Sequence, residues 1–400
     1  MSISIAQRVS HTRPSDTLSL SAIANQLKAE GKPIINLTVG EPDFLTPKPI
    51  REAVREALSQ GRYTKYTPVD GTATLKAAIT RKFKQDNQLH YQAEQLIVST
   101  GAKQAIYNLM QALLNPGDEV IIPAPYWVSY PSMVSLASAV SVVITAGIEQ
   151  LFKITAEQLA QAITPKTRLL LLNSPANPTG AFYTRTELEA LADVLLRHPD
   201  IIILSDDIYE SICWSTEPFI NILQACPALY DRTVIINGVS KAYAMTGWRI
   251  GYAAGPVDLI KAMVTVQSQS TSCPNALAQF AAQIALTGDQ QCVVDMKTAY
   301  QARHQKMLEG LRKIPGIDCL AAEGAFYSFP AITELLQRLK LETDEALARY
   351  LLETAQLATV PGTGFGIEGH LRISFALNEA DIDKALERLD RAIGTGGISS

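Results

Sequence analysis

Cysteine is scarce in this 400-residue sequence: there are five, at positions 213, 226, 273, 292 and 319. Their odd number, their scatter and the lack of a Cys-x-x-Cys pair predict free thiols in a reducing compartment, without structural zinc. An excess of charge of one sign is also missing, since the formal net charge is −4 and the pI is 5.8. Nucleic acid and anionic membranes are therefore not expected as partners.

Long hydrophobic runs are missing as well. No apolar stretch approaches the roughly 20 residues that a membrane-spanning helix needs. The first residues carry Arg8, Arg13 and Asp16 without the apolar core of a secretory signal. The tight Gly-x-x-x-x-Gly-Lys loop is absent, which argues against ATP as a ligand. We therefore expect a cytoplasmic protein with no membrane association and no metal at its functional site.

What the sequence does have is apolar material in a regular order. Hydrophobic residues make up 47% of the chain and charged residues 18%, which is a globular composition. Seven short runs read as strands that are apolar on both faces, at residues 95–100, 119–122, 140–145, 168–172, 201–204, 233–236 and 249–254. Helical patterns separate most of them, so we predict an α/β fold: a mainly parallel seven-stranded sheet with helices on both faces.

After about residue 274 the pattern changes to long helices and a few strands. We expect a second, smaller α+β domain there. The predicted division is 1–46 for an N-terminal arm and part of the small domain, 47–285 for the large domain, and 286–400 for the small C-terminal domain. The glycine-rich segment 362–369 resembles a dinucleotide-binding loop. Because a strand rather than a helix is expected after it, we interpret it as an ordinary loop.

One lysine organises the chemistry. The strand at 233–236 breaks at an Asn-Gly turn, and Lys241 and Arg249 follow it before the next apolar run begins. Ligands of such sheets bind at the carboxyl ends of the strands. An amine there can condense with a carbonyl group, and a guanidinium can bind a phosphate through two donors. Two solvated cations on a loop are the ordinary alternative, but the flanking apolar runs leave neither residue a long polar face.

The stretch from Ser240 to Gly251 resembles the lysine signature of the class I aminotransferases, the fold-type-I enzymes that depend on pyridoxal 5'-phosphate. The resemblance covers about residues 13–391. It implies that Lys241 is the catalytic residue and holds the cofactor as a Schiff base. Arg249 and Ser240 would bind the cofactor phosphate.

Other strand ends carry candidates for the rest of the cofactor. Asp206 ends a buried strand, where a carboxylate is costly unless a cation pairs with it; a protonated pyridine nitrogen would serve. Asp207 competes for this role, and a helix N-cap is the structural alternative. The resemblance favours Asp206 because Tyr209 lies three residues on. Tyr209 and Asn177 would hydrogen-bond the ring hydroxyl.

The remaining cofactor contacts come from two loops. Gly101 and Ala102 stand at a strand-to-helix junction, whose backbone amides can bind an anion. The resemblance makes Trp127 the ring that stacks on the cofactor and contacts substrate, and a core or interface role is the alternative. Tyr66 matches a tyrosine that reaches the phosphate of a neighbouring subunit, which implies a homodimer with shared active sites.

The predicted substrate contacts centre on Arg372, an arginine inside an apolar strand. Such a residue implies a buried anion, and the α-carboxylate of an amino acid fits. Gly40 and Asn177 match positions around the same carboxylate. Lys103 and Arg13 match a subgroup, the bacterial aspartate aminotransferases that also accept prephenate, in which they face the distal carboxylate.

The resemblance therefore implies a ping-pong aminotransferase that acts on amino acids and 2-oxo acids. Lys241 would take the α-proton and return it within the same site. The favoured substrates are aspartate and 2-oxoglutarate, with prephenate as a further candidate. Another enzyme of this fold, such as an aromatic or alanine aminotransferase or a carbon–sulfur lyase, stays open as an alternative. A cofactor-sensing regulator is disfavoured because the chain has no added DNA-binding region.

Overall fold

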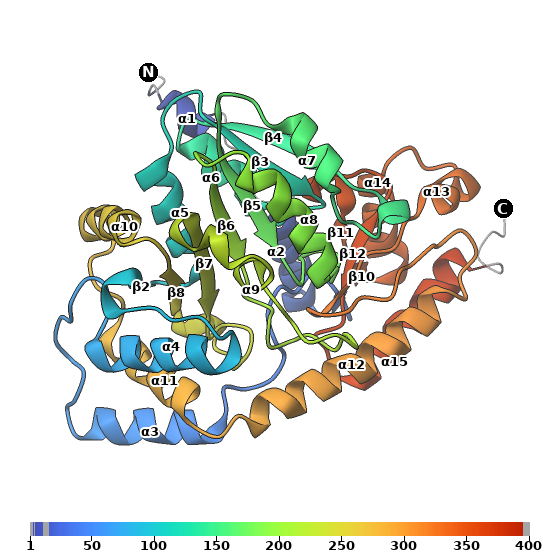
Figure 1. Cartoon of the computed structure of the whole chain (residues 1–400). Coiled ribbons are helices and arrows are strands. Elements are labelled where there is room, and N and C mark those ends of the chain that lie inside the picture. Colours follow the sequence, from blue (N-terminus) through green and yellow to red (C-terminus); the bar gives the residue numbers. More distant parts are fainter. Residues whose placement is uncertain (1–2, 4, 11–15, 395–400) are drawn as a thin grey trace.

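Seven strands form the central sheet in the computed structural model, which describes residues 3, 5–10 and 16–394 (Figure 1). Their spatial order is β2-β8-β7-β6-β5-β3-β4. The pairs among β7, β6, β5, β3 and β4 are parallel, and β8 runs antiparallel to both of its neighbours. The predicted seven-stranded, mainly parallel sheet is confirmed. The strands are β2 Leu96–Ser99, β3 Glu119–Ala124, β4 Val140–Thr145, β5 Thr167–Asn173, β6 Ile202–Asp206, β7 Thr233–Gly238 and β8 Gly251–Ala254.

Helices cover both faces of the sheet. Successive residues of a strand point to opposite faces, so one strand contributes to the apolar cluster on each face. Ile235 of β7 belongs to one apolar cluster, whereas Val234 and Ile236 belong to another. Each fully buried side chain of this size contributes roughly 1.5–3 kcal/mol. The first cluster takes in α3 Lys48–Ser59, α4 Ala73–Asp86, α7 Ala156–Ala162, α8 Arg185–Leu196, α9 Ile222–Ala225 and α11 Ala276–Thr287. The second takes in α5 Ala102–Leu113, α6 Ser129–Leu136 and α10 Val257–Ser270.

Local sequence signals explain where several of these helices begin. Thr72 accepts a hydrogen bond from the Leu75 amide at the start of α4. Thr184 and Glu187 form a reciprocal capping box at the start of α8. Such caps satisfy backbone groups that the helix itself leaves without partners.

A third apolar cluster packs the C-terminal part of the chain together with Ile35 and Leu37. The long helix α12 leads from α11 into this part (Figure 1). A three-stranded antiparallel sheet has the order β11-β12-β9, and β1 pairs in parallel with β10. The remaining α-helices and strands of the chain are α1 Gln7–Ser10, α2 Asp16–Ala29, β1 Ile35–Asn36, α12 Gln291–Leu311, β9 Tyr327–Ser328, α13 Thr333–Leu339, α14 Asp344–Tyr350, β10 Leu357–Ala358, β11 Val360–Pro361, β12 Leu371–Ser374 and α15 Glu379–Ile393.

The packing gives the expected mixed α+β character after the sheet, while the boundaries 1–46, 47–285 and 286–400 stay a prediction. Residues 362–369 hold a short 3-10 turn that leads into β12, so interpreting them as an ordinary loop was right. Several predicted strand edges are off by one or two residues. At β8, which begins at Gly251 and not at 249, the reason is that Arg249 has a left-handed backbone with φ of 56°. Extended strand pairing cannot include such a residue.

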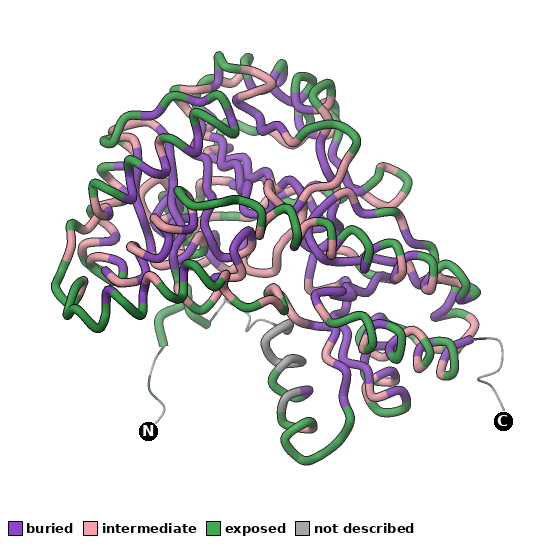
Figure 2. Tube along the Cα trace, turned by 90° about the horizontal axis from the view of Figure 1, so that it is seen from below, coloured by how far each residue is buried: buried purple, intermediate pink, exposed green. Residues whose placement is uncertain are grey.

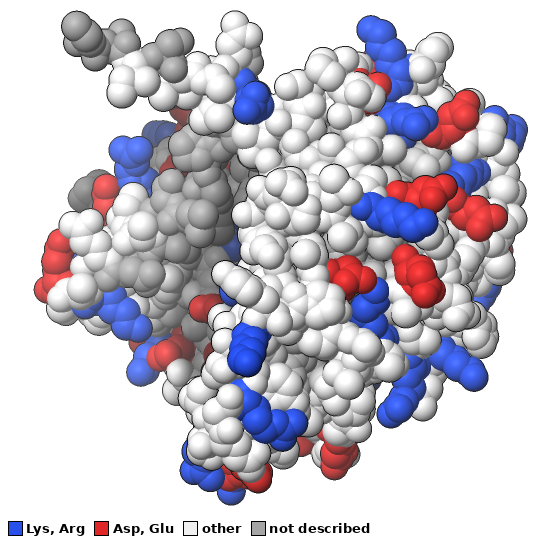
Figure 3. Space-filling model, turned by 90° about the vertical axis from the view of Figure 1, so that its left-hand side faces the viewer, with Lys and Arg blue, Asp and Glu red and all other residues white. Residues whose placement is uncertain are grey.

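Burial follows the same plan. In Figure 2 the buried stretches trace the strands and the inward sides of the helices, and the exposed stretches lie outside. Acidic and basic side chains are interspersed on the face that Figure 3 shows. No helix within the described residues has the length and apolarity to cross a bilayer, and no metal-binding group of His, Cys, Asp or Glu occurs among them.

Candidate active site

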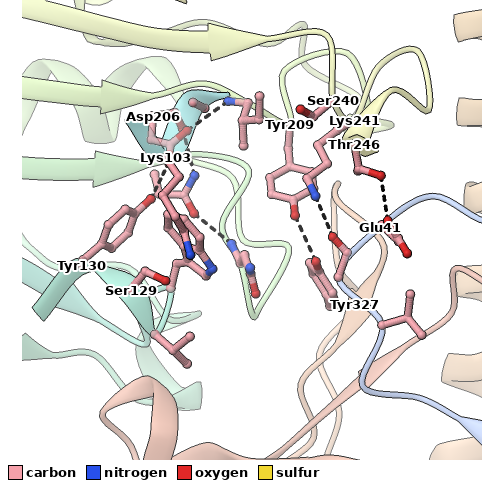
Figure 4. Close-up of a pocket in the computed structure, with 18 of the residues that line it drawn as sticks. Glu41, Lys103, Ser129, Tyr130, Asp206, Tyr209, Ser240, Lys241, Thr246 and Tyr327 are labelled. Carbon is pink, nitrogen blue, oxygen red and sulfur yellow. Dashed lines mark hydrogen bonds between the residues drawn. The ribbon is translucent and has the colours of Figure 1, made fainter. Parts of the chain in front are cut away.

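A cavity of about 560 Å³ opens at the carboxyl ends of β5, β6 and β7, within the range of ligand sites. Figure 4 shows Asp206, Tyr130 and Lys103 on one side of it and Lys241, Tyr209 and Tyr327 on the other. Predicted site residues in its wall are Gly40, Ala102, Lys103, Trp127, Asn177, Asp206, Tyr209, Ser240, Lys241, Arg249 and Arg372. Eleven positions spread over 333 residues of sequence therefore meet in one place.

Lys241 follows β7 and reaches across to the segment after β1. Its Nζ donates a hydrogen bond to the carbonyl oxygen of Gly40 at 2.6 Å. Burial lowers the pKa of Lys241 to about 8; Glu41 opposes this shift, and Arg249 adds to it. A substantial part of the amine is then neutral near physiological pH, as a nucleophile or proton acceptor must be.

Asp206 is the carboxylate of the cavity. Its Oδ2 accepts a hydrogen bond from the Tyr130 hydroxyl at 2.6 Å, and its Oδ1 accepts one from the Ile208 amide at 3.3 Å. Burial raises the pKa of Asp206 to about 6, and the bond from Tyr130 limits the rise. No cation forms a salt bridge with it within the described residues. A cationic group of a ligand would therefore supply the partner that this buried carboxylate lacks.

Asp207 does not line the cavity. Its two carboxylate oxygens accept hydrogen bonds from Ser205 Oγ at 2.6 Å and Asn221 Nδ2 at 3.0 Å, both on the side away from the cavity. The structure therefore separates the two neighbouring aspartates, and only Asp206 can contact a ligand there.

Arg372 on β12 is a buried guanidinium, 2% exposed. Nη2 donates to the Thr38 carbonyl at 2.6 Å and Nη1 donates to Asn177 Oδ1 at 3.1 Å, while Nε has no partner in the described part of the chain. The ring of Tyr327 lies 4.5 Å from the guanidinium carbon. Because no carboxylate pairs with it among the described residues, this charge is free to bind an anionic ligand, and two-pronged contact with a carboxylate suits it.

The tyrosines extend this side of the site. Tyr209 and Tyr327 are fully buried and their hydroxyl oxygens lie 3.0 Å apart. Burial raises the pKa of Tyr209 well above 10, so both hydroxyls carry their protons and either can donate.

Gly101 forms the opposite corner, at the start of α5. Its φ is 86°, and a Cβ there would lie 2.5 Å from Nη2 of Arg249. A side chain would thus fill the space between the helix start and the guanidinium. Free amides at a helix start attract anions. Burial lowers the pKa of Lys103, as does Arg249 nearby, and its Nζ lies 4.8 Å from the Trp127 ring.

Two predicted residues within the described part of the chain, Gly101 and Tyr66, are not among those that line the cavity. Tyr66 is 94% exposed and lies outside the cavity wall. Arg13 lies outside the described residues. Conversely, sequence reasoning missed several polar wall residues, among them Tyr130, Tyr327, Glu41 and Thr246, whose Oγ1 donates to Glu41 at 2.7 Å. The signal available for them was proximity to predicted residues, as with Glu41 beside Gly40 and Thr246 between the lysine and the arginine.

Comparisons with known proteins point in one direction. The family model described as aminotransferase class I and II matches residues 32–389. An aspartate/prephenate aminotransferase of Nitrosomonas europaea is 51% identical over 391 residues, covering 96% of this chain and 98% of that protein. The crystal structure of the aspartate aminotransferase from Rhizobium meliloti matches with a TM-score of 0.94 at 46% identity, over 98% of this chain and 99% of that one. The aspartate aminotransferase from Thermus thermophilus with maleate matches with a TM-score of 0.91 at 42% identity, over 98% and 100%.

Proposed function

This chain belongs to the class I and II aminotransferases, and on that premise we propose that it moves the amino group of L-aspartate to 2-oxoglutarate. The products are oxaloacetate and L-glutamate. Its cofactor is pyridoxal phosphate. We propose prephenate as a second acceptor, because relatives at 51% and 48% identity bear the name aspartate/prephenate aminotransferase.

The observation that carries this proposal is the chemistry of the donor set. Lys241 supplies an amine of lowered pKa, and Asp206 a buried carboxylate without a cation. The corner at Gly101 and Arg249 offers room and charge for a phosphate. The residues present therefore fit pyridoxal phosphate, with Asp206 facing the ring nitrogen, Tyr209 and Asn177 the ring hydroxyl, and Trp127 the ring face. Arg249, Ser240, Gly101 and Ala102 would hold the phosphate.

When bound, the cofactor ring withdraws the electrons that are released as the Cα–H bond breaks. The protein does the rest. Arg372 binds the substrate carboxylate through two donors and, with Gly40 and Asn177, fixes the orientation of the Cα–H bond. Lys241 Nζ accepts the proton from Cα and returns it to the carbon bonded to the other side of the substrate nitrogen, so one base serves both transfers.

Aspartate is favoured over apolar donors because the cavity carries Lys103 as a cation in addition to Lys241, Arg249 and Arg372. Lys103 lies beside Trp127, and we propose that the distal carboxylate of a dicarboxylic substrate extends toward it. The relatives' names agree with aspartate and give no support to the alternatives of an aromatic or alanine aminotransferase or a carbon–sulfur lyase. A coupled assay for oxaloacetate from aspartate and 2-oxoglutarate tests the proposal, and its failure with active holoenzyme on other donors would refute it.

Replacing Lys103 with alanine should lower kcat/KM for aspartate by roughly 10- to 150-fold, because a hydrogen bond to a charged group is worth about 1.5–3 kcal/mol. The value for alanine as donor should change by less than about threefold, because alanine has no distal carboxylate to lose a contact. Steady-state kinetics on both donors measure this. An equal loss of kcat/KM for aspartate and alanine would show that Lys103 does not bind the distal carboxylate. We propose Arg13 as a second cation that binds the same carboxylate.

Replacing Tyr130 with phenylalanine should weaken cofactor binding below neutral pH. The Tyr130 hydroxyl lowers the pKa of Asp206, which burial has raised to about 6. Without this bond the pKa rises by on the order of one unit, since a charge-assisted bond is worth roughly 1.5–3 kcal/mol. The carboxylate form is then lost at a higher pH. Cofactor affinity titrated from pH 5.5 to 8.5 should show its acidic edge displaced upward, and an unmoved edge would contradict the assignment.

We propose a homodimer with shared active sites. Tyr66 supports it, because its side chain is almost fully exposed and does not line the cavity that holds Lys241. In the partner it would reach the cofactor phosphate. Sedimentation velocity measures the assembly, and a monomeric holoenzyme would exclude the role of Tyr66. A cytoplasmic location is proposed from the free thiols.

A further inference from the structure

The turn that carries Asp206 and Tyr209 has a buried polar network behind it, on the side away from the cavity. Asp207 and Glu210 alternate with the two cavity residues and point into this network. We call it the rear network; its members are Lys82, Asn87, Ser205, Asp207, Glu210, Asn221 and Asn237.

Glu210 is the centre of the rear network. It forms a salt bridge with Lys82 of α4, and each of the two side chains is 8% exposed. Asn237 Nδ2 donates to Glu210 Oε1 at 2.8 Å and Asn87 Nδ2 donates to Oε2 at 3.0 Å. Lys82 Nζ also donates to Asn87 Oδ1 at 2.7 Å. Both carboxylate oxygens are thus held, from α4 on one side and the end of β7 on the other.

The other end of the turn is fixed in the same way. Ser205 and Asn221 bind the Asp207 carboxylate, and the Asp207 amide donates to the Ile236 carbonyl on β7 at 2.9 Å. The Glu210 amide donates to the Asp207 carbonyl at 2.9 Å, which closes the turn. The residue that directly follows each member of the cavity-facing pair, Asp207 after Asp206 and Glu210 after Tyr209, is therefore anchored by its side chain.

Stability alone does not account for a buried ion pair here. Removing two charges from water is expensive, and apolar residues of similar volume often stabilise a fold as well or better. What an ion pair with neutral donors on both oxygens provides is a fixed geometry. Cofactor-facing side chains need such support, because a site whose supporting residues are loose loses the alignment of its contacts.

We propose that Glu210, held by Lys82, is a positioning residue that keeps Asp206 and Tyr209 aimed at the cofactor; this rests on the proposed function. Glu210 touches neither cofactor nor substrate. Its effect reaches the site through the backbone of the turn, because Glu210 directly follows Tyr209 and its amide donates to the carbonyl of Asp207, which directly follows Asp206.

The test is Glu210→Gln in the holoenzyme, with cofactor affinity and absorbance as readouts. Glutamine keeps the shape but cannot accept on both ends or pair with Lys82. The cofactor dissociation constant should rise roughly 10- to 100-fold, the range found when outer partners of metal ligands are removed. The pH midpoint of the absorbance change of the bound cofactor should also move, because Asp206 and Tyr209 set the charge at the ring.

The matched control is Glu187→Gln. Glu187 pairs with Lys153 at 2.6 Å, the side chains of the lysine and the glutamate are 9% and 36% exposed, and neither residue lines the cavity. This variant should lose some thermal stability while its cofactor affinity stays within twofold and its absorbance midpoint stays unchanged. A structural role common to buried pairs would move both variants alike.

Where Glu210→Gln fails to fold because Lys82 loses its buried carboxylate partner, the double variant Lys82→Met/Glu210→Gln removes the lysine charge as well and is tested in its place. A folded variant that lacks the Glu210 carboxylate, yet binds cofactor as the wild type does, overturns the proposal. This outcome is independent of the proposed substrate, because cofactor affinity is measured without aspartate. A wild type that binds cofactor but makes no oxaloacetate would refute the substrate and leave the rear network to be judged on its own.

Discussion

Replacing Lys241 with alanine should lower the rate of oxaloacetate formation by roughly 10⁴-fold, because the variant loses both its proton acceptor and its covalent attachment point. No other amine in the cavity can take over. Lys103, the second lysine of the wall, lies against Trp127 on the far side from Gly40, the residue that Lys241 contacts. Steady-state kinetics of the two half-reactions measure the loss.

The same variant has a chemical signature that activity alone lacks. Borohydride reduction of the wild-type holoenzyme, followed by digestion, should place the pyridoxyl mass on the peptide that contains Lys241. Lys103→Ala, the matched control from the same cavity, should keep this labelled peptide, whereas Lys241→Ala should have none. A pyridoxyl mass on another lysine of the wild type would remove the basis of the proposed mechanism.

The sheet could be predicted from sequence because its signals are local. Each strand is a short apolar run, and the polar residue that follows it, such as Asp206 or Lys241, falls at the same edge of a parallel sheet. This rule predicts that these polar residues lie in one region of the folded chain. The strand edge at 249 failed because Arg249 has a left-handed backbone, which the apolar run that follows it does not indicate.

Partners that lie far apart in the sequence could not be predicted. The bond from Tyr130 to Asp206 spans 76 residues and the pair of Lys82 with Glu210 spans 128, and no local pattern encodes either. The choice between Asp206 and Asp207 required the direction of each side chain at the turn, which depends on packing against α4 and β7. Tyr66 depends on a second chain, so one sequence can suggest its role only by resemblance.

Charge connects the observations in the cavity. Lys241, Arg249, Arg372 and Lys103 line one cavity with Asp206 and Glu41, so cations outnumber carboxylates by four to two. The excess favours ligands with carboxylate and phosphate groups. It also helps to lower the pKa of Lys241, where burial is the main cause and Arg249 and Arg372 contribute. The same charges that bind the ligand therefore prepare the base.

Replacing Arg372 with methionine should separate activity from stability. We expect kcat/KM for aspartate to fall by roughly 10³-fold, the loss for removing one partner of a buried charged contact. The free energy of unfolding should change by no more than about 1 kcal/mol, because the wild-type guanidinium is buried without a carboxylate and methionine avoids its desolvation. Urea denaturation of the cofactor-free protein and steady-state kinetics measure the two quantities.

The control is Arg303→Met, at a second buried arginine that does have a partner. Arg303 Nη1 lies 2.7 Å from Asp43 Oδ1, so methionine there leaves a carboxylate unpaired and should cost about 1–3 kcal/mol of stability. The two variants should thus differ in opposite ways: Arg303→Met in stability, Arg372→Met in catalysis. A loss of stability at Arg372 as large as that at Arg303 would mean that the guanidinium belongs to the fold. The substrate carboxylate would then bind elsewhere.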